Sequence, residues 1–145
     1  MTDAEDEWKT WNRLGDPVEH IDLRNWADLF LIAPLSAHTL AKLAHGLCDD
    51  TLSCVARAWR YSSPLIVAPA MNTAMWDHPA TNEQLDRIRS WGATVVDPET
   101  KVLACGELGF GALASVYCIV KAVRDCIDSA IRKPRHAQLN KVHGC

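Results

Sequence analysis

The chain has 145 residues, of which 48% are hydrophobic, and its 15 Lys and Arg against 18 Asp and Glu give a formal net charge of -3. A chain of this length and apolar content can bury a core, so disorder is excluded and we expect residues 1–145 to form a single domain. No block of Lys and Arg offers a basic face, which excludes nucleic acid as a partner.

The sequence also argues against a membrane or secreted protein. No apolar run approaches the roughly 18 residues that a membrane span needs, and the acidic N-terminus lacks the apolar core of a secretion signal. Six cysteines stand at irregular spacings without a CxxC pair, a pattern that predicts neither a zinc site nor a disulfide framework. We therefore expect a cytoplasmic protein without a metal, whose cysteines are mostly reduced and buried.

Alternating strands and helices are predicted along the chain. The apolar run at residues 28–33 predicts a strand that ends at Pro34, and similar runs at 64–70 and 93–98 predict a second strand and a weaker third. The predicted helices span residues 36–45, ended by Gly46; 50–60; 81–91, ended by Gly92; and 115–131. Continuous apolar strands covered on both faces and joined by helices indicate the α/β class with a parallel sheet.

The start of the chain departs from a complete doubly wound sheet. Such a sheet opens with a strand and a Gly-rich turn, which holds a cofactor phosphate at a helix N-terminus. Residues 7–12 are instead acidic and contain Trp. We therefore expect a Rossmann-like sheet that is truncated at its N-terminus.

Polar, helix-starting segments follow the first two predicted strands, at residues 34–39 and 69–76. In an open α/β sheet, ligands bind at the carboxyl ends of parallel strands. We therefore expect these two segments to lie at one edge of the same sheet and to face one crevice.

On the pattern alone, purely structural roles stay open for residues of these two segments. Ser36 and Thr39 are typical helix caps. Met71, Met75 and Trp76 form a cluster of a kind that more often belongs to a core than to a site.

Two further residues are candidates for acid–base chemistry. Cys105 stands in a glycine-rich stretch, residues 103–114, which predicts an exposed loop where a substrate can reach a thiol. His20 stands between Glu19 and Asp22, and nearby carboxylates raise the basicity of a histidine that acts as a general base. On the pattern alone, a structural cysteine and a surface histidine are the commoner outcomes.

Five motifs stand in a fixed order: Gly-Asp-Pro-Val-Glu-His-Ile-Asp-Leu-Arg-Asn-Trp-Ala-Asp at 15–28, Pro-Leu-Ser-Ala-His-Thr-Leu-Ala-Lys at 34–42, Gly-Leu-Cys-Asp-Asp at 46–50, Pro-Ala-Met-Asn-Thr-Ala-Met-Trp at 69–76 and Ala-Cys-Gly-Glu at 104–107. Together they resemble the phosphopantothenoylcysteine decarboxylases, a branch of the flavin-containing cysteine decarboxylase family. The resemblance covers residues 7–131 and leaves 132–145 as a polar tail. The Met- and Asn-containing octet is specific to the wider family, and the Cys105 loop disfavours its peptidyl-cysteine decarboxylase branch.

The resemblance implies a three-layer, flavodoxin-like subunit of a trimer, formed with identical or with full-length subunits, in which FMN and 4'-phosphopantothenoylcysteine bind at each interface. It implies that His20 is the catalytic base, that Cys105 is the proton donor, and that Asn72 holds the substrate carboxylate. The implied substrate contacts beside Cys105 are Ala104 and Gly106. The implied FMN contacts are Ser36, Ala37, His38, Thr39, Ala70 and Met75.

The activity implied by the resemblance is a carboxy-lyase reaction that yields 4'-phosphopantetheine in coenzyme A biosynthesis. Direct loss of carbon dioxide would leave an unstabilised carbanion, so the flavin first oxidises the thiol-bearing carbon to a thioaldehyde, which acts as an electron sink. Decarboxylation gives an enethiol, and the returned electrons with a proton from Cys105 restore the saturated thiol. The cofactor carries the difficult step, and the protein orients and protonates.

Several features depart from the pattern of this family. Its N-terminal strand and flavin-phosphate turn, about a third of the usual domain, are missing, His38 and Asp50 stand where Asn is usual, and Ser115 stands where Glu is usual. These departures favour an alternative, a non-catalytic or regulatory subunit of a related hetero-trimer that is inactive alone. Retention of all three implied catalytic and substrate-holding residues favours the enzyme.

Overall fold

The computed structural model describes residues 17–102 and 108–132. Its elements are α2 (Glu19–Trp26), β1 (Phe30–Leu35), α3 (Ala37–His45), α4 (Thr51–Arg57), β2 (Leu65–Pro69), α5 (Thr73–Trp76), α6 (Pro79–Ser90), β3 (Thr94–Val95), β4 (Glu99–Val102), β5 (Leu108–Ala112) and α7 (Val116–Arg132). Parallel strands alternate with helices from β1 to β3, which confirms the α/β class.

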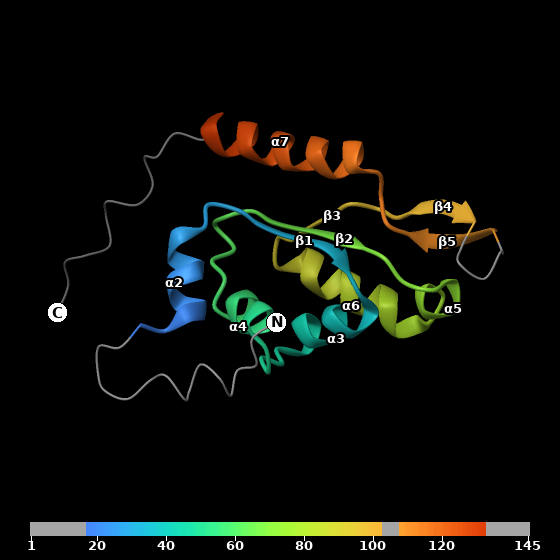
Figure 1. Cartoon of the computed structure of the whole chain (residues 1–145), viewed down its shortest axis with the longest axis horizontal. Coiled ribbons are helices and arrows are strands. Elements are labelled where there is room, and N and C mark those ends of the chain that lie inside the picture. The colour runs from blue at the N-terminus through green and yellow to red at the C-terminus, as the bar shows by residue number, and fades with distance from the viewer. Residues whose placement is uncertain (1–16, 103–107, 133–145) are drawn as a thin grey trace.

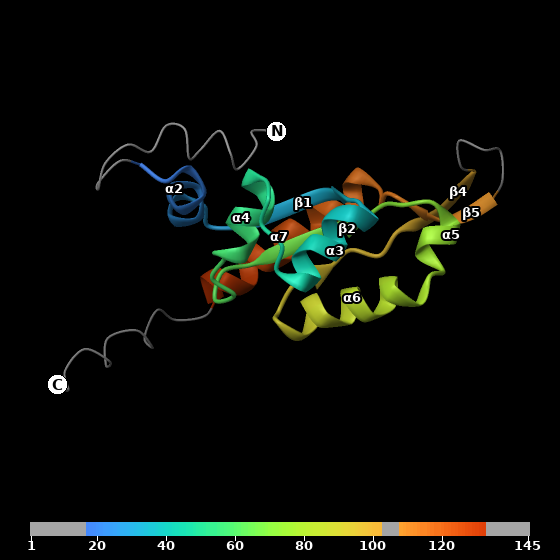
Figure 2. The same cartoon turned by 90° about the horizontal axis from the view of Figure 1, so that it is seen from below.

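A parallel sheet in the order β1-β2-β3 lies at the centre. Figure 1 shows α7 on one side of this sheet and α3, α4 and α6 on the other, and Figure 2 shows the same layers from below. Every residue of β2 is buried, because both edges of this strand are paired and both of its faces are covered. The predicted three-layer arrangement is confirmed.

The main core lies between the sheet and the layer of α3, α4 and α6. Its most deeply buried side chains are Leu35, Leu40, Leu65, Val67, Leu85 and Ile88. A smaller cluster under α7 contains Ala68, Ala114 and Ile119. Neighbouring Val67 and Ala68 serve different clusters because successive strand residues point to opposite faces.

Burial on both faces, predicted for all three strands, holds only for β2. β1 lies at the edge of the described sheet, and Leu31 is 38% exposed there. β1 also continues through Pro34 to Leu35, so the prediction that it ends at Pro34 was wrong. Proline lacks an N–H to donate, and an edge strand tolerates that loss. β3 has only two residues, of which Thr94 is exposed.

All four predicted helices are present, and the helix predicted at 115–131 is α7 (Val116–Arg132), shifted by one residue. α3 ends as predicted at Gly46, whose φ of 73° is the left-handed conformation that glycine adopts readily. α4 stops at Arg57 rather than at residue 60. α6 begins at Pro79 rather than at residue 81, since proline suits the first helical position and His78 accepts the N–H of Ala80.

An antiparallel hairpin of β4 and β5 replaces much of the predicted exposed loop. The prediction for residues 103–114 was wrong at 108–112, which form a strand, and Gly111 is buried there. The glycines were interpreted as signs of a loop, whereas Gly111 allows a close backbone approach within a strand.

Of the cysteines in the described residues, Cys48 and Cys118 are exposed and Cys54 and Cys126 are half-buried, and none of these four forms a disulfide. The prediction of buried thiols was therefore wrong for these four. Within the same residues, the helices are too short or too polar to cross a membrane. The described part of the chain also contains no cluster of side chains that could hold a metal ion.

Candidate functional site

The carboxyl ends of β1 and β2 bring the two predicted segments together. Leu35 pairs with Pro69 at the ends of these parallel strands. Ala70 donates its backbone N–H to the carbonyl oxygen of Leu35 at 3.0 Å. The prediction that residues 34–39 and 69–76 lie at one edge of the sheet is confirmed.

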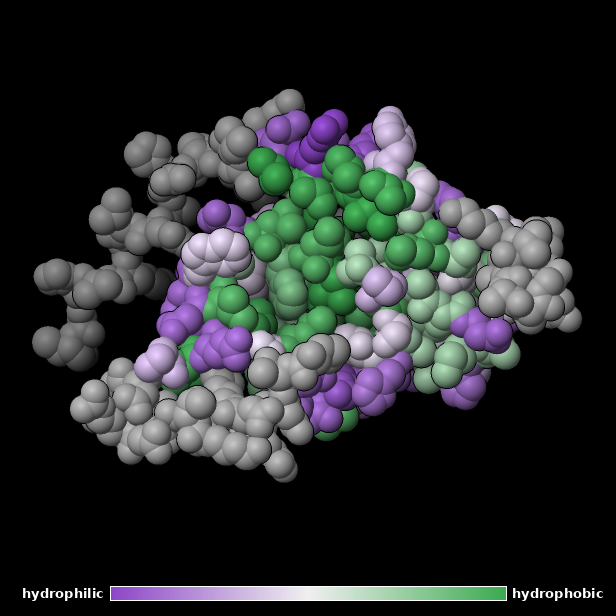
Figure 3. Space-filling model, in the orientation of Figure 1, coloured by the Kyte–Doolittle hydropathy of each residue, from purple (hydrophilic) through white to green (hydrophobic). Residues whose placement is uncertain are grey.

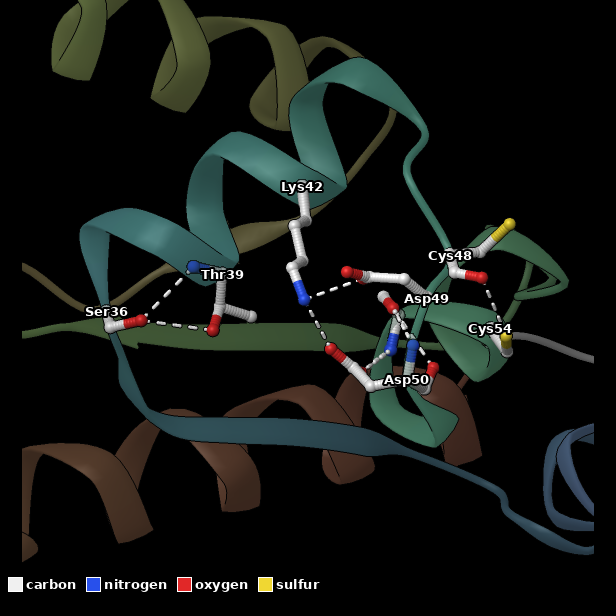
Figure 4. A network of polar contacts seen from close by, with 8 residues as sticks. Ser36, Thr39, Lys42, Cys48, Asp49, Asp50 and Cys54 are labelled. Atoms are coloured by element: carbon white, nitrogen blue, oxygen red, sulfur yellow. Dashed lines mark hydrogen bonds and ion pairs between the residues drawn. The ribbon is translucent and has the colours of Figure 1, made fainter. Parts of the chain in front are cut away.

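Ser36 begins α3 at this edge. Its Oγ accepts the backbone N–H of Thr39 at 3.1 Å and lies 3.0 Å from Thr39 Oγ1 (Figure 4). The capping role left open by the sequence is therefore present. Within the described residues, no hydrogen bond uses the backbone N–H groups of Ala37 and His38, so this first turn presents donors at the positive end of a helix.

Asn72 begins α5, and the cap that it makes orients its side chain. Its Oδ1 accepts the backbone N–H of Ala74 at 2.9 Å, which leaves the Nδ2 amide group as the free donor end. Asn72 is an exposed residue. A carboxylate accepts N–H donors, so this geometry fits the role in holding a substrate carboxylate.

The cluster of Met and Trp beside Asn72 divides into core and surface. Met71 and Trp76 are half-buried and pack against the main core, as the plainer interpretation expected. Met75 is 54% exposed at the same edge. A polarizable thioether on the surface suits contact with a flat ring, as implied for Met75.

Contacts that the sequence did not predict fasten α5 to β5. Met71 donates its backbone N–H to Gly111 O at 2.9 Å, and Thr73 Oγ1 donates to Phe110 O at 3.1 Å. The Trp76 and Phe110 rings meet edge to face with centroids 5.2 Å apart. The only sequence signal for this contact was glycine near residue 111, which was assigned to a loop.

His20 lies in α2, a helix that the sequence analysis did not predict. α2 has no side-chain cap and none of its residues is buried, so the usual sequence signals of a helix are absent. Figures 1 and 2 both place α2 at the opposite end of the described structure from α5. A single chain therefore does not bring His20 together with Asn72.

Cys105, Ala104 and Gly106 lie outside the described residues. β4 ends at Val102 and β5 begins at Leu108, so these three residues belong to the connection between the two strands of the hairpin. Their predicted roles stay predictions.

An ion-pair cluster lies farther along α3, where Lys42 Nζ is 2.6 Å from Asp49 Oδ1 and 2.8 Å from Asp50 Oδ2 (Figure 4). Hydrogen bonds to Asp49 and Asp50 raise the pKa of Lys42. The bond to Lys42 lowers the pKa of Asp49. Burial raises the pKa of Asp50, but the donors of Lys42 and Ser53 outweigh burial and the net pKa is lowered.

Structural roles account for two of the three departures from the family's pattern. Asp50 caps α4 through a reciprocal pair of bonds with Ser53, and it carries the charge that pairs with Lys42. Ser115 Oγ accepts the backbone N–H of Cys118 at 3.4 Å, so this serine side chain caps the start of α7. His38 is exposed in the first turn of α3, and no contact in the structure explains it.

Comparison with known proteins matches the Flavoprotein family over residues 1–128. The chain belongs to the flavoprotein family. It is 57% identical over 120 residues to the phosphopantothenoylcysteine decarboxylase of Oryza sativa subsp. japonica, with 83% of this chain and 54% of that protein covered. The family predicted from the sequence motifs is confirmed. The chain spans 54% to 65% of the length of the curated plant relatives that it matches.

Solved structures share the fold of this flavoprotein chain. A cysteine-to-serine variant of PPC decarboxylase complexed with pantothenoylaminoethenethiol superposes with a TM-score of 0.82 at 51% identity, over 88% of this chain and 70% of that one. The FMN binding protein AtHal3 superposes with a TM-score of 0.78 at 52% identity, over 88% and 69%. The flavodoxin-like fold is confirmed.

Proposed function

We propose that this chain is an FMN-dependent carboxy-lyase subunit, which converts 4'-phosphopantothenoylcysteine to 4'-phosphopantetheine in coenzyme A biosynthesis. The observation that carries the proposal is that the Ser36 turn and Asn72 follow paired strand ends at one edge of the sheet. Relatives 51% to 57% identical to this chain are named for this decarboxylase activity.

The chemistry of this edge fits FMN. The first turn of α3 supplies a hydroxyl at Ser36 and the backbone donors of Ala37 and His38, with Thr39 beside them. Ala70 and the exposed thioether of Met75 supply apolar surface from the neighbouring strand end. When bound, FMN supplies the oxidation of the thiol-bearing carbon and the return of its electrons.

The residues of the chain bind, orient and move protons. Asn72 donates from Nδ2 to the substrate carboxylate, which fixes the group that leaves as carbon dioxide. His20 accepts the proton released when the substrate is oxidised, and Cys105 returns a proton at the end, with Ala104 and Gly106 lining the substrate. Such positioned acids and bases contribute roughly 10²–10⁴ in rate.

The site is completed between neighbouring chains of a trimer, of identical or of full-length subunits. His20 and Asn72 lie at opposite ends of one chain, so a neighbour has to supply one of them (Figures 1 and 2). Large exposed apolar side chains support assembly: Trp26 is 81% exposed, and Val116 and Tyr117 are each 76% exposed. Figure 3 shows a broad hydrophobic area over β1 and α7. Such areas mark sites of association.

We assign this activity to the cytoplasm. Free thiols at the surface, Cys48 and Cys118, persist in a reducing compartment and support that location.

The test begins with a titration of the purified chain with FMN, in which the visible absorption band of the flavin reports binding. Ser36→Ala should weaken FMN binding, because it removes the hydroxyl at the first turn of α3. Ser129→Ala removes an exposed hydroxyl of α7 and is the matched control, which should bind FMN as the unmodified chain does. Equal FMN affinity in all three proteins would contradict this assignment.

The FMN-loaded chain is then mixed with 4'-phosphopantothenoylcysteine, alone and beside full-length subunits that are inactive by themselves. Release of carbon dioxide supports the enzyme. Absence of turnover in both mixtures, with FMN bound, would favour the regulatory subunit.

A further inference from the structure

We propose that Thr73 and Gly111 are positioning residues of the candidate site. They clamp the turn that carries Asn72 to the β4–β5 hairpin, and so hold the substrate carboxylate at a fixed place relative to this hairpin. The inference rests on the proposed function, because it takes Asn72 as the residue that holds the carboxylate.

Hydrogen bonds from both neighbours of Asn72 reach the same strand. On one side, the backbone N–H of Met71 donates to Gly111 O at 2.9 Å. On the other side, Thr73 Oγ1 donates to Phe110 O at 3.1 Å. Since consecutive carbonyls of β5 accept these two bonds, the backbone of Asn72 is held on both sides.

Gly111 permits this close approach. Its φ of +124° lies in a region that favours glycine, and the residue is buried. A Cβ at this position would lie 2.4 Å from the carbonyl oxygen of Met71, a distance that real Cβ atoms do not show. Any side chain here would push the hairpin away from α5.

A ring contact anchors the clamp to the core. Phe110, whose carbonyl accepts the Thr73 bond, places its ring 5.2 Å from that of Trp76. Trp76 packs against the main core. The hairpin is therefore connected through α5 to the main core.

The bond from the Thr73 hydroxyl to Phe110 O is a contact of the clamp that a conservative substitution can remove. Thr73→Val removes this hydroxyl at nearly constant shape, and Thr73→Ser retains it.

Amide hydrogen exchange tests the clamp without any activity. Thr73→Val should speed exchange of the Met71 amide about three- to tenfold, the range that loss of one neutral hydrogen bond gives. Thr73→Ser should exchange as the unmodified chain does, and so should Thr94→Val, the control at an exposed threonine of β3. Gly111→Ala should produce the same or a larger increase. Unchanged Met71 exchange in Thr73→Val would overturn the clamp.

Steady-state kinetics of the FMN-loaded chain tests the positioning role. Thr73→Val should raise KM for 4'-phosphopantothenoylcysteine about three- to tenfold with FMN affinity unchanged, and Thr73→Ser should restore the unmodified KM. Faster Met71 exchange together with an unchanged KM would overturn the positioning role. Faster exchange of the Met71 amide in a chain that shows no turnover would refute the proposed function. The clamp would then be a structural contact without a role in catalysis.

Discussion

Ala70 donates its backbone N–H to the carbonyl oxygen of Leu35 at 3.0 Å, just beyond the pair that ends the β1–β2 ladder. This bond joins the segment before α3 to the segment before α5. The Ser36 turn and Asn72 therefore cannot separate unless the sheet opens, and the donors of both are presented at one edge.

Asn72 has two separable functions, a helix cap and a carboxylate donor. Asn72→Ala should destabilise the chain by about 1 kcal/mol, because it removes the side-chain oxygen that accepts the backbone N–H of Ala74 and caps α5. Asn72→Asp retains the accepting oxygen and should change stability by no more than about 0.5 kcal/mol, since both residues cap well. Both variants should weaken substrate binding at least about tenfold, as expected for a lost bond to a charged group. Calorimetry measures both quantities, and substrate affinity retained in Asn72→Asp would remove Asn72 from the site.

The ion pairs of Lys42 should give stability a defined pH dependence. The lowered pKa values of Asp49 and Asp50 mean that their contribution is complete above the ordinary carboxyl pKa of about 3.9 and is lost as pH falls through the folded values. The raised pKa of Lys42 means that its contribution is complete below the ordinary lysine pKa of about 10.4 and is lost as pH rises through the folded value. Lys42→Met should lower Tm between about pH 5 and 9, and this difference should shrink near pH 2.

Lys121→Met is the control for that experiment, because Lys121 and Asp125 form an ion pair whose side chains are 62% and 61% exposed. Exposed pairs contribute little, so Tm should change little at any pH. A Tm difference for Lys42→Met that is the same at pH 2 and pH 7 would show that packing, not charge, accounts for the effect.

His38 occupies the first turn of α3, at a position where the resemblance to the decarboxylase family implies Asn. His38→Asn replaces an imidazole with a compact amide that can donate and accept beside the backbone donors. We expect FMN affinity to rise about three- to tenfold, measured by quenching of flavin fluorescence. His45→Asn, at the other end of the same helix, is the matched control and should leave affinity unchanged. A fall in affinity on His38→Asn would show that the histidine itself contacts the cofactor.

Some elements could be predicted from the sequence because their signals are local. β2 has five consecutive apolar residues, and all are buried. α3 begins at a Ser cap and ends at a glycine with positive φ, so both ends were marked in the sequence. The shared edge of residues 34–39 and 69–76 followed from the general geometry of parallel strands.

The missed features either lack a local sequence signal or depend on contacts between distant segments. α2 has no buried residue, so no apolar stripe reveals it. The β4–β5 hairpin contains glycines that resemble a loop, and Gly111 is needed only because Met71 lies against it. The separation of His20 from Asn72 is a property of the whole chain, and no local pattern encodes it.

The separation of His20 from Asn72 predicts that two inactive variants of the chain can complement each other. His20→Asn and Asn72→Asp should each be inactive alone, because every interface then lacks one function. In trimers formed from an equal mixture, about a quarter of the interfaces should pair an intact His20 with an intact Asn72 from a neighbour, as random cyclic assembly gives. Activity of the mixture should therefore recover to about a quarter of the unmodified level. A mixture as inactive as its components would show that the site is not shared between chains.

Replacement of the proton donor Cys105 should change the product that is released and should leave the first step, oxidation of the substrate, unaffected. Cys105→Ser replaces a thiol of pKa about 8.5 with a far weaker acid, so the oxidised, decarboxylated enethiol should accumulate. Cys118→Ser, at an exposed thiol of α7, is the control and should give the normal product. Wild-type turnover by Cys105→Ser would return this cysteine to a structural role.

The most direct test of the account is mass-spectrometric identification of the product formed from 4'-phosphopantothenoylcysteine by the FMN-loaded chain under anaerobic conditions. We predict 4'-phosphopantetheine, lighter than the substrate by one carbon dioxide and with its saturated carbons intact, because electrons taken from the substrate are returned to it. Recovery of unchanged substrate by a chain that binds FMN, alone and with full-length subunits that are inactive by themselves, would contradict the proposed decarboxylase function.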